Sequence, residues 1–208
     1  ILLEPIRRDL QFSDTQLGLL SGIAFAIFYA TMGIPIARLA DRSSRVNIIT
    51  ASLAAWSIMT AFCGLAQNFW QLLAGRVGVA VGEAGSGPAS HSLLSDYFTL
   101  ETRATAMGIY AMGVPIGTLI GLLAGGWLAE WFDWRTAFIV VGLPGVLMAV
   151  IVKLTLAEPP RGNSDLVRHH HQPATLKQVV AYLWRRASFF HVTMAVATHA
   201  FVSYGVNG

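Results

Sequence analysis

The sequence predicts an all-α membrane protein, and three observations lead to this fold class. Hydrophobic residues make up 54% of the 208 positions and charged residues only 12%, whereas soluble domains carry about 25% charged residues. The charged residues fall in clusters that leave long neutral runs between them. Nearly all of these runs reach the roughly 20 residues that a helix needs to cross the hydrocarbon core of a bilayer. The chain is therefore expected to cross a membrane several times.

Six apolar segments are expected to form spanning helices. In chain order they are residues 17–37, 46–66, 69–95, 104–129, 136–156 and 187–208. The polar pair Gln67 and Asn68 divides the second segment from the third. The fifth segment reaches spanning length if Lys153 extends its ammonium group to the membrane surface and the helix continues to Leu156. The chain begins with Ile1 rather than Met and ends inside the sixth segment, so we expect it to be a fragment.

A polar stretch separates the fifth span from the sixth. Residues 158–172 contain paired prolines, a Gly-Asn pair and three histidines after Arg168, a composition typical of a flexible linker. No metal site is expected there, because no carboxylate or cysteine completes a set of ligands. After Pro173, apolar residues at helical spacing predict a short basic helix on the cytoplasmic membrane surface. Its apolar residues are Leu176, Val179, Val180, Leu183 and Trp184, and its basic residues are Lys177, Arg185 and Arg186.

The basic residues between the spans predict the orientation of the chain. They concentrate on one side, which the positive-inside rule makes cytoplasmic. The net charge of +3 therefore reflects membrane topology rather than nucleic-acid binding. We expect a multi-pass protein of a bacterial inner membrane. The cytoplasmic side holds Arg38, Arg42, Arg45, Arg103, Lys153, Arg161, Arg168, Lys177, Arg185 and Arg186, and the other side holds Arg7, Arg8 and Arg135.

Two charged residues, Arg76 and Glu83, lie inside the third apolar segment. An uncompensated charge at the bilayer centre costs about 2.5–3.5 kcal/mol, so chains keep one mainly where it faces a cavity, a partner or a solute. Seven residues make two helical turns, which puts both side chains on one face about 10 Å apart along the axis. That gap leaves room for a solute or another acid and predicts a substrate or proton-coupling site. The alternative is a structural ion pair in which Arg76 extends toward the membrane surface.

Glycine and proline recur inside the apolar segments and are expected to interrupt several helices. In the fourth segment Gly113, Gly117, Gly121 and Gly125 recur every fourth residue around Pro115. They form a flat stripe on one helix face, where another backbone can approach closely. Plain helix packing and a sliding contact between two bundles explain this stripe equally well. The other combinations are Gly33 with Pro35, Gly85 with Pro88, and Gly142 with Pro144 and Gly145.

The turn Arg-Leu-Ala-Asp-Arg-Ser-Ser-Arg at residues 38–45 resembles the signature loop between the second and third helices of the major facilitator superfamily, G-x-x-x-D-R-x-G-R-R. Asp41, Arg42 and Arg45 match this pattern, whereas Ala37 and Ser44 stand at its glycine positions. Residues 76–84 resemble the fourth-helix motif of the same superfamily. Their Gly-Glu-Ala ending, with Asp-Tyr-Phe at residues 96–98, is similar to the spinster-like branch. Residues 131–138 resemble the turn that leads into the sixth helix.

This resemblance implies a partial major facilitator fold, with the spans here as helices 2 to 7 of a twelve-helix transporter. Residues 1–157 would be the N-terminal bundle without its first helix, residues 158–186 a cytoplasmic linker, and residues 187–208 the start of the C-terminal bundle. Asp41, Arg42 and Arg45 would belong to a conformational lock between the two bundles. Arg76 and Glu83 would line the central cavity, and the glycine stripe would meet the second bundle.

The implied function is secondary active transport of a small organic or amphiphilic solute by alternating access, coupled to protons. The expected partners are a small-molecule or lipid-like substrate, protons and membrane lipids, with no nucleic acid, no metal and no cofactor. The resemblance implies a full-length protein that is monomeric and not an enzyme. An organic-anion/proton symporter of another branch is an alternative.

Two alternatives belong to other functional classes. An intramembrane serine protease would use Ser86, which lies between two glycines, as nucleophile and His199 as base. His91 fits that role less well, because residues five apart on one helix point about 140° away from each other. The other alternative is a membrane receptor or scaffold that transports nothing.

Overall fold

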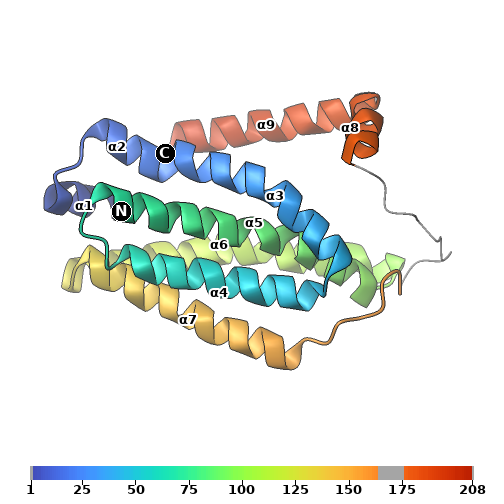
Figure 1. Ribbon diagram of the computed structural model, residues 1–208, viewed down its shortest axis with the longest axis horizontal. Helices are drawn as coiled ribbons and strands as arrows, with labels where there is room; N and C mark the ends of the chain where they lie inside the picture. Colours follow the sequence, from blue (N-terminus) through green and yellow to red (C-terminus); the bar gives the residue numbers. More distant parts are fainter. Residues whose placement is uncertain (1, 164–175, 208) are drawn as a thin grey trace. The chain divides into compact units, whose positions relative to one another are not determined.

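The computed structural model describes residues 2–163 and 176–207, and these residues are almost entirely helical (Figure 1). They divide into two compact units, with the boundary between residues 166 and 167. The first unit contains α1 (Leu3–Leu10), α2 (Asp14–Gly18), the π-helix η1 (Leu19–Ile23), α3 (Ala24–Arg42), α4 (Arg45–Cys63), α5 (Phe69–Tyr97), α6 (Leu100–Trp131) and α7 (Trp134–Thr155). The second contains α8 (Leu176–Trp184) and α9 (Ala187–Asn207).

Each of the six predicted spanning segments is a helix, and the predicted all-α membrane fold is confirmed. The first span is continuous, because α2, η1 and α3 follow one another without a break. Among the described residues, four helices are long and apolar enough to cross a membrane, namely Asp14–Arg42, Arg45–Cys63, Leu100–Trp131 and Trp134–Thr155. Helices α5 and α9 also have spanning length, with 29 and 21 residues, but α5 contains charged side chains and α9 contains two histidines.

Side chains immediately before the helices explain where several of them begin. Ser44, Asn68 and Asp133 each accept a hydrogen bond from the backbone N–H three residues later, at 3.2, 3.0 and 2.6 Å. Such a cap satisfies one of the donors that a helix leaves unpaired at its N-terminus. The hydrogen bond from the N–H of Thr136 holds the pKa of Asp133 below its ordinary value. These caps fix the starts of α4, α5 and α7.

The prolines do not interrupt the helices, which corrects the expectation from the sequence. Pro35, Pro88, Pro115 and Pro144 all lie inside continuous helices. A proline removes its own backbone hydrogen bond and crowds the carbonyl one turn before it, but inside a membrane local adjustments and neighbouring groups satisfy the freed carbonyl. In an apolar surrounding the remaining bonds are strongly favoured, because an unpaired backbone group has no water to bind. The spans therefore continue through all four positions.

Close packing in the first unit centres on α4, which lies against α5 and α7. Glycines on the two outer helices permit this approach. A Cβ atom on Gly82 of α5 would lie 2.7 Å from the backbone nitrogen of Trp56, and one on Gly142 of α7 would lie 2.7 Å from that of Ala61. Real Cβ atoms do not come that close to backbone atoms. The three helices are thus in contact through their backbones.

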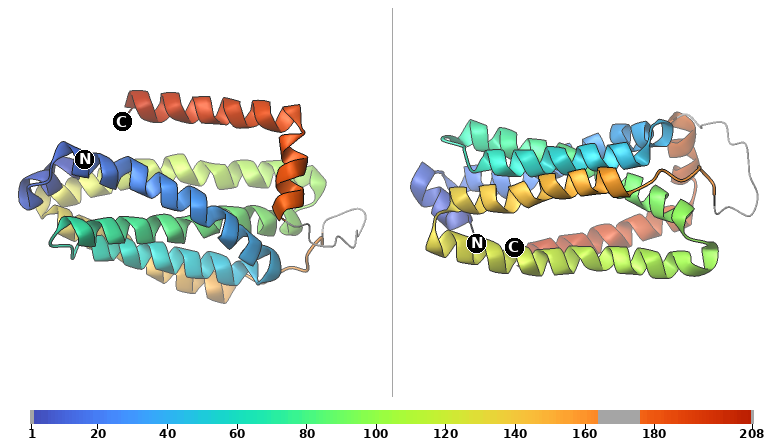
Figure 2. Two further views of the ribbon diagram at one scale, coloured as in Figure 1. Left: turned by 45° about the horizontal axis from the view of Figure 1, so that its top comes forward. Right: turned by 90° about the horizontal axis from the view of Figure 1, so that it is seen from below.

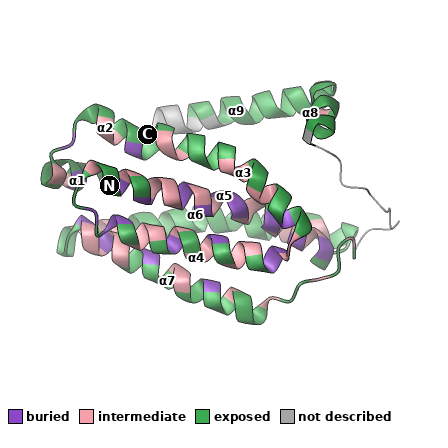
Figure 3. Cartoon of the chain, viewed as in Figure 1, coloured by how far each residue is buried: buried purple, intermediate pink, exposed green. Residues whose placement is uncertain are grey.

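The glycine stripe of α6 has a different environment from the glycines of α5 and α7. A Cβ atom added to Gly113, Gly117, Gly121 or Gly125 would meet nothing within 4 Å among the described residues. No residue of α6 is buried, and Figure 3 shows the helix exposed along most of its length. The close approach of another backbone that the sequence suggests for this stripe is therefore not found among the described residues of the first unit.

In the second unit, α8 and α9 are joined by a tight turn at Arg185 and Arg186. Figure 2 shows that α8 runs crosswise to α9 rather than continuing it. Helix α8 coincides with the short amphipathic helix predicted after Pro173. The three consecutive histidines and the rest of residues 164–175 of the predicted linker lie outside the described residues.

Candidate functional site

Arg76 is held by the helix that runs beside α5 in the first unit. Its Nε donates a hydrogen bond of 3.4 Å to the carbonyl oxygen of Leu20, which lies in the π-helical segment η1. Its guanidinium carbon lies 5.1 Å from the centre of the Phe25 ring, a distance typical of a cation–π contact. Both partners belong to the first span. The charge is therefore oriented by a neighbouring helix rather than extended to the membrane surface.

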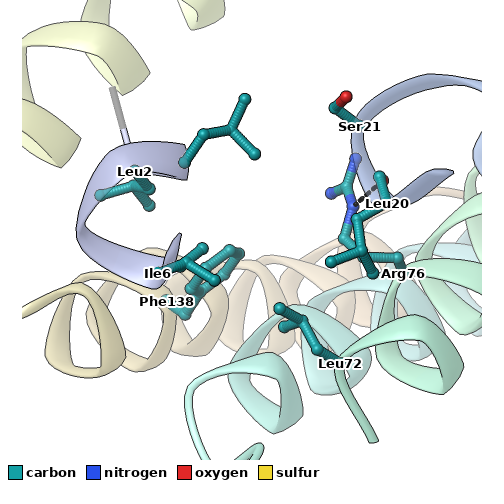
Figure 4. Close-up of a pocket in the computed structure, with 8 residues that line it drawn as sticks. Leu2, Ile6, Leu20, Ser21, Leu72, Arg76 and Phe138 are labelled. Carbon is teal, nitrogen blue, oxygen red and sulfur yellow. Dashed lines mark hydrogen bonds between the residues drawn. The ribbon is translucent and has the colours of Figure 1, made fainter. Parts of the chain in front are cut away.

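Arg76 also forms one wall of an apolar cavity of about 200 Å³. Figure 4 shows aliphatic side chains from the α1 region on one side of the cavity and the guanidinium on the other. Arg76 is the only charged residue in the lining. Such a cavity suits a solute with an apolar body and an acidic group. The lining residues are Leu2, Leu3, Ile6, Leu20, Ser21, Leu72, Arg76 and Phe138.

Glu83 lies two turns further along α5 and is partly buried. No ion pair joins it to Arg76, and its carboxylate has no hydrogen-bond partner among residues 2–163 and 176–207. A structural ion pair between the two residues is therefore absent from the described part of the chain. A carboxylate without a fixed partner inside a span can exchange between a proton, a solute and water. That property favours a functional role over a purely structural one.

The serine and histidine of the protease alternative are not brought together in the first unit. The hydroxyl of Ser86 donates to the carbonyl oxygen of Glu83 at 3.0 Å, a bond within its own helix that is common for serine in apolar helices. His91 is exposed, and its Nδ1 lies 3.3 Å from the sulfur of Met107. His199 belongs to the second unit. The described residues thus show Ser86 in a packing role.

Arg45 is the centre of a second charged cluster, at the end of the bundle where α4 begins. Its side chain is only 1% exposed and forms ion pairs with Asp96 and Glu158, the second at 2.7 Å. The same guanidinium donates to the carbonyl oxygen of Pro159 at 2.9 Å and to the hydroxyl of Ser92 at 3.2 Å. A buried arginine is tolerated only when it is fully paired in this way. The cluster therefore ties together the ends of α4, α5 and α7.

Glu158 follows α7 and is bonded to the bundle rather than being part of a flexible linker. Its carboxylate accepts hydrogen bonds from the hydroxyl of Ser44 at 2.8 Å and from the N–H of Val46 at 2.9 Å, besides the ion pair with Arg45. Partial burial opposes ionisation, but these donors outweigh it and lower the pKa of Glu158. The linker expected from residue 158 onward is thus fixed to the bundle at least through Asn163, whose amide donates to the carbonyl oxygen of Asp96.

Asp41 and Arg42, the other two residues of the predicted lock, lie apart from this cluster. Both are exposed at the end of α3. Within the described ranges neither has a hydrogen bond or an ion pair, whereas Arg161 donates to the backbone carbonyls of Ala40 and Ser43 on either side of them, at 2.6 Å each. Of the three residues predicted to form the lock, only Arg45 is buried and ion-paired within the described residues. The acids that pair with it, Asp96 and Glu158, were not predicted.

The opposite end of the bundle carries a smaller cluster that was also not predicted. Asp9 of α1 pairs with Arg135 at 2.9 Å and accepts a hydrogen bond from the indole of Trp134 at 3.2 Å. The guanidinium of Arg135 lies 4.2 Å from the centre of the Trp134 ring. Together with the buried Ile6, these contacts hold α1 across that end of α7.

Known proteins with related sequences include an efflux pump. Over 156 residues the chain is 40% identical to an MFS-type efflux pump of Mycolicibacterium smegmatis, a match that covers 75% of this chain and 36% of that protein. It is 29% identical over 203 residues to protein spinster of Drosophila melanogaster, with 97% of this chain and 33% of the relative covered. The chain thus spans about a third of the length of these two relatives.

The fold also matches a solved structure. A crystal structure of a bacterial homologue of the human lysosomal transporter spinster, in an inward-facing and unoccupied conformation, is 40% identical in sequence. It superposes with a TM-score of 0.76 over 99% of this chain and 48% of that one. The sequence model of the Major Facilitator Superfamily matches residues 1–207. This match, the relatives and the shared helical architecture establish that the chain belongs to the Major Facilitator Superfamily.

Proposed function

We propose that this chain works in a secondary active transporter that moves a small organic or amphiphilic solute by alternating access, with proton coupling. The observation that carries the proposal is the pair of charges on α5. Arg76 is oriented by Leu20 and Phe25 toward an apolar cavity, and Glu83 stands two turns away without a fixed partner among the described residues. Family membership supports transport as the general activity.

In this mechanism Arg76 binds the acidic group of the solute and Glu83 carries the proton. The guanidinium keeps its charge throughout, because an arginine does not lose its proton under physiological conditions. The carboxylate of Glu83 has no competing arginine or lysine in direct contact within the described residues, so a proton can neutralise it. Protonation then lowers the cost of exposing the site to an apolar surrounding. Proton binding at Glu83 and solute binding at Arg76 are thereby linked along α5, which carries both residues.

The Arg45 cluster and the exposed residues Asp41 and Arg42 beside it have separate roles in the proposed cycle. The cluster of Arg45, Asp96 and Glu158 keeps one end of the bundle intact, because its two ion pairs join residues of the first unit. Asp41 and Arg42 are exposed beside it, where they are accessible to a second bundle. We assign to these two residues the contacts that form and break as the transporter alternates. The side of the membrane on which they lie is cytoplasmic by the distribution of basic residues.

An organic-anion/proton symporter is the second candidate, and the small cavity with a single guanidinium favours it. Both candidates are tested with the full-length protein in proteoliposomes under an imposed pH gradient, with a panel of labelled organic anions and single-chain lipids. Glu83→Gln should abolish gradient-driven accumulation of whichever solute the parent protein accumulates. Glu130→Gln is the matched control, since it makes the same change at an exposed position near the end of α6. Undiminished accumulation by the Glu83 variant would refute the assignment, and no uptake of any panel member by the parent would count against transport of this solute class.

A further inference from the structure

The second unit places a short helix crosswise at the start of a long uncharged one. Helix α9 has 21 residues and contains no Asp, Glu, Lys or Arg, which gives it the roughly 30 Å needed to cross the hydrocarbon core. Figure 2 shows α8 running across the end of α9. If α9 crosses the bilayer, α8 therefore lies along the membrane surface. Its position is set by the tight turn at Arg185 and Arg186.

The charge of this region has one sign. After Asp165 the sequence contains no Asp or Glu, whereas Lys177, Arg185 and Arg186 flank the apolar side chains of α8. Arg186 is engaged by Tyr182, with a hydrogen bond of 2.9 Å to its hydroxyl and a ring contact at 4.8 Å. Lys177 and Arg185 have no acid to pair with in their own unit. Their charges are available to an anionic partner.

These two cations border a shallow groove on one face of α8. The groove is lined by Lys177, Val180, Ala181, Trp184 and Arg185. These residues follow the spacing of a single helix face, so the apolar side chains lie between the two cations. The indole of Trp184 is 82% exposed, which is typical of tryptophan at a membrane interface rather than in a protein core.

We propose that α8 is a docking surface for anionic phospholipids, with phosphates on Lys177 and Arg185 and acyl chains against Val180 and Trp184. The charge complementarity, the crosswise geometry and the exposed indole all fit this partner. An acidic protein segment would satisfy the cations but not the need of Trp184 for an apolar environment. Each cation near an anionic surface strengthens such binding about fivefold at moderate ionic strength.

The test measures lipid contact at Trp184 in the full-length protein. The protein is reconstituted in phosphatidylcholine vesicles that contain either brominated phosphatidylglycerol or brominated phosphatidylcholine. Bromine quenches nearby tryptophan, and the signal of Trp184 is obtained as the difference between the parent and Trp184→Phe. We expect brominated phosphatidylglycerol to quench this signal more strongly than brominated phosphatidylcholine. Lys177→Gln should lower that preference about fivefold, and the double variant with Arg185→Gln should remove it.

A second basic pair provides the matched control. Arg7 and Arg8 are exposed residues of α1, and their double replacement by Gln removes the same charge from a different helix. That variant should keep the full preference of Trp184 for phosphatidylglycerol. High salt should reproduce the effect of the α8 variants on the parent protein, which excludes misfolding as the cause. Equal quenching by the two lipids in the parent, or an unchanged preference in the α8 double variant, would overturn the proposal.

Discussion

The cluster around Arg45 gives the sharpest test of how charges are arranged in this bundle. The perturbation is Asp96→Asn, which keeps the size of the side chain and removes one of the two carboxylates that neutralise Arg45. The guanidinium would then remain buried with Glu158 as its single ionic partner. The bundle should be destabilised as a whole, because the cluster joins the ends of three helices.

The expected magnitudes follow from exposure. Removing one partner of a buried ion pair costs about 3–5 kcal/mol, and because Glu158 remains we expect about 3 kcal/mol for Asp96→Asn. The side chain of Glu158 is 32% exposed, so water partly replaces it, and Glu158→Gln should cost about 1 kcal/mol. Asp41→Asn makes the same chemical change as Asp96→Asn at an exposed position of the same end, and should stay within about 0.5 kcal/mol.

The assay is the free energy of unfolding of the full-length protein in mixed micelles, with helix content followed by circular dichroism as denaturing detergent is added. The expected order of destabilisation is Asp96→Asn, then Glu158→Gln, then Asp41→Asn. An Asp41 variant as unstable as the Asp96 variant would refute this reasoning, because the exposed end of α3 would then contribute as much to the free energy of unfolding as the buried ion pair. An Asp96 variant as stable as the parent would show that Arg45 does not need its second carboxylate.

Three further predictions follow from separate features. Folding lowers the pKa of Glu158, so its carboxylate stabilises the bundle above its unfolded pKa of about 4.3 and loses that effect as the pH falls below this value. The unfolding midpoint should therefore drop more on acidification in the parent than in Glu158→Gln. Gly82→Ala forces a methyl group against the backbone of Trp56 and should destabilise the protein by about 1–3 kcal/mol. Gly117→Ala adds a methyl group where no described atom lies within 4 Å, so it should be neutral or slightly stabilising in this chain. Equal effects of the two variants on thermal unfolding of the 208-residue chain would contradict the packing argument. In the full-length protein, Asp41→Asn should change the labelling rates of cysteines engineered on the two membrane sides while solute affinity stays nearly constant; an affinity loss without a change in labelling would instead assign Asp41 to binding.

The spanning helices were predictable because their evidence is local. A neutral run of about 20 residues defines a span wherever its partners lie, and residues such as Asn68 and Asp133 act as helix caps on the next few residues. The continuity of the helices through proline was not predictable from the same rules. Proline breaks helices in water, but Pro88 lies inside a continuous spanning helix. The helix continues because the apolar surrounding penalises any further loss of backbone hydrogen bonds.

The candidate site was predictable only in part. Arg76 and Glu83 are visible in the sequence because a charge in an apolar run is rare. The acids that neutralise Arg45 are not, since Asp96 and Glu158 lie 51 and 113 residues away from it. A hydropathy pattern does not say which helix ends meet in space. The roles proposed for Arg76 and Glu83 on α5 are predictions, which the variants described above test.

The backbone contacts among α4, α5 and α7 have a consequence for how this half of the protein moves. Where helices meet through glycines, no side chain lies between them that can change its rotamer to absorb a displacement. A Cβ atom does not fit against Trp56 or Ala61 of α4 at the positions of Gly82 and Gly142. If either neighbouring helix slid or turned, residues that carry a Cβ would take these positions and clash with α4. We expect the three helices to move as one rigid unit. In the transport cycle proposed above, solute access would then change by tilting of this unit against more loosely packed elements such as α6.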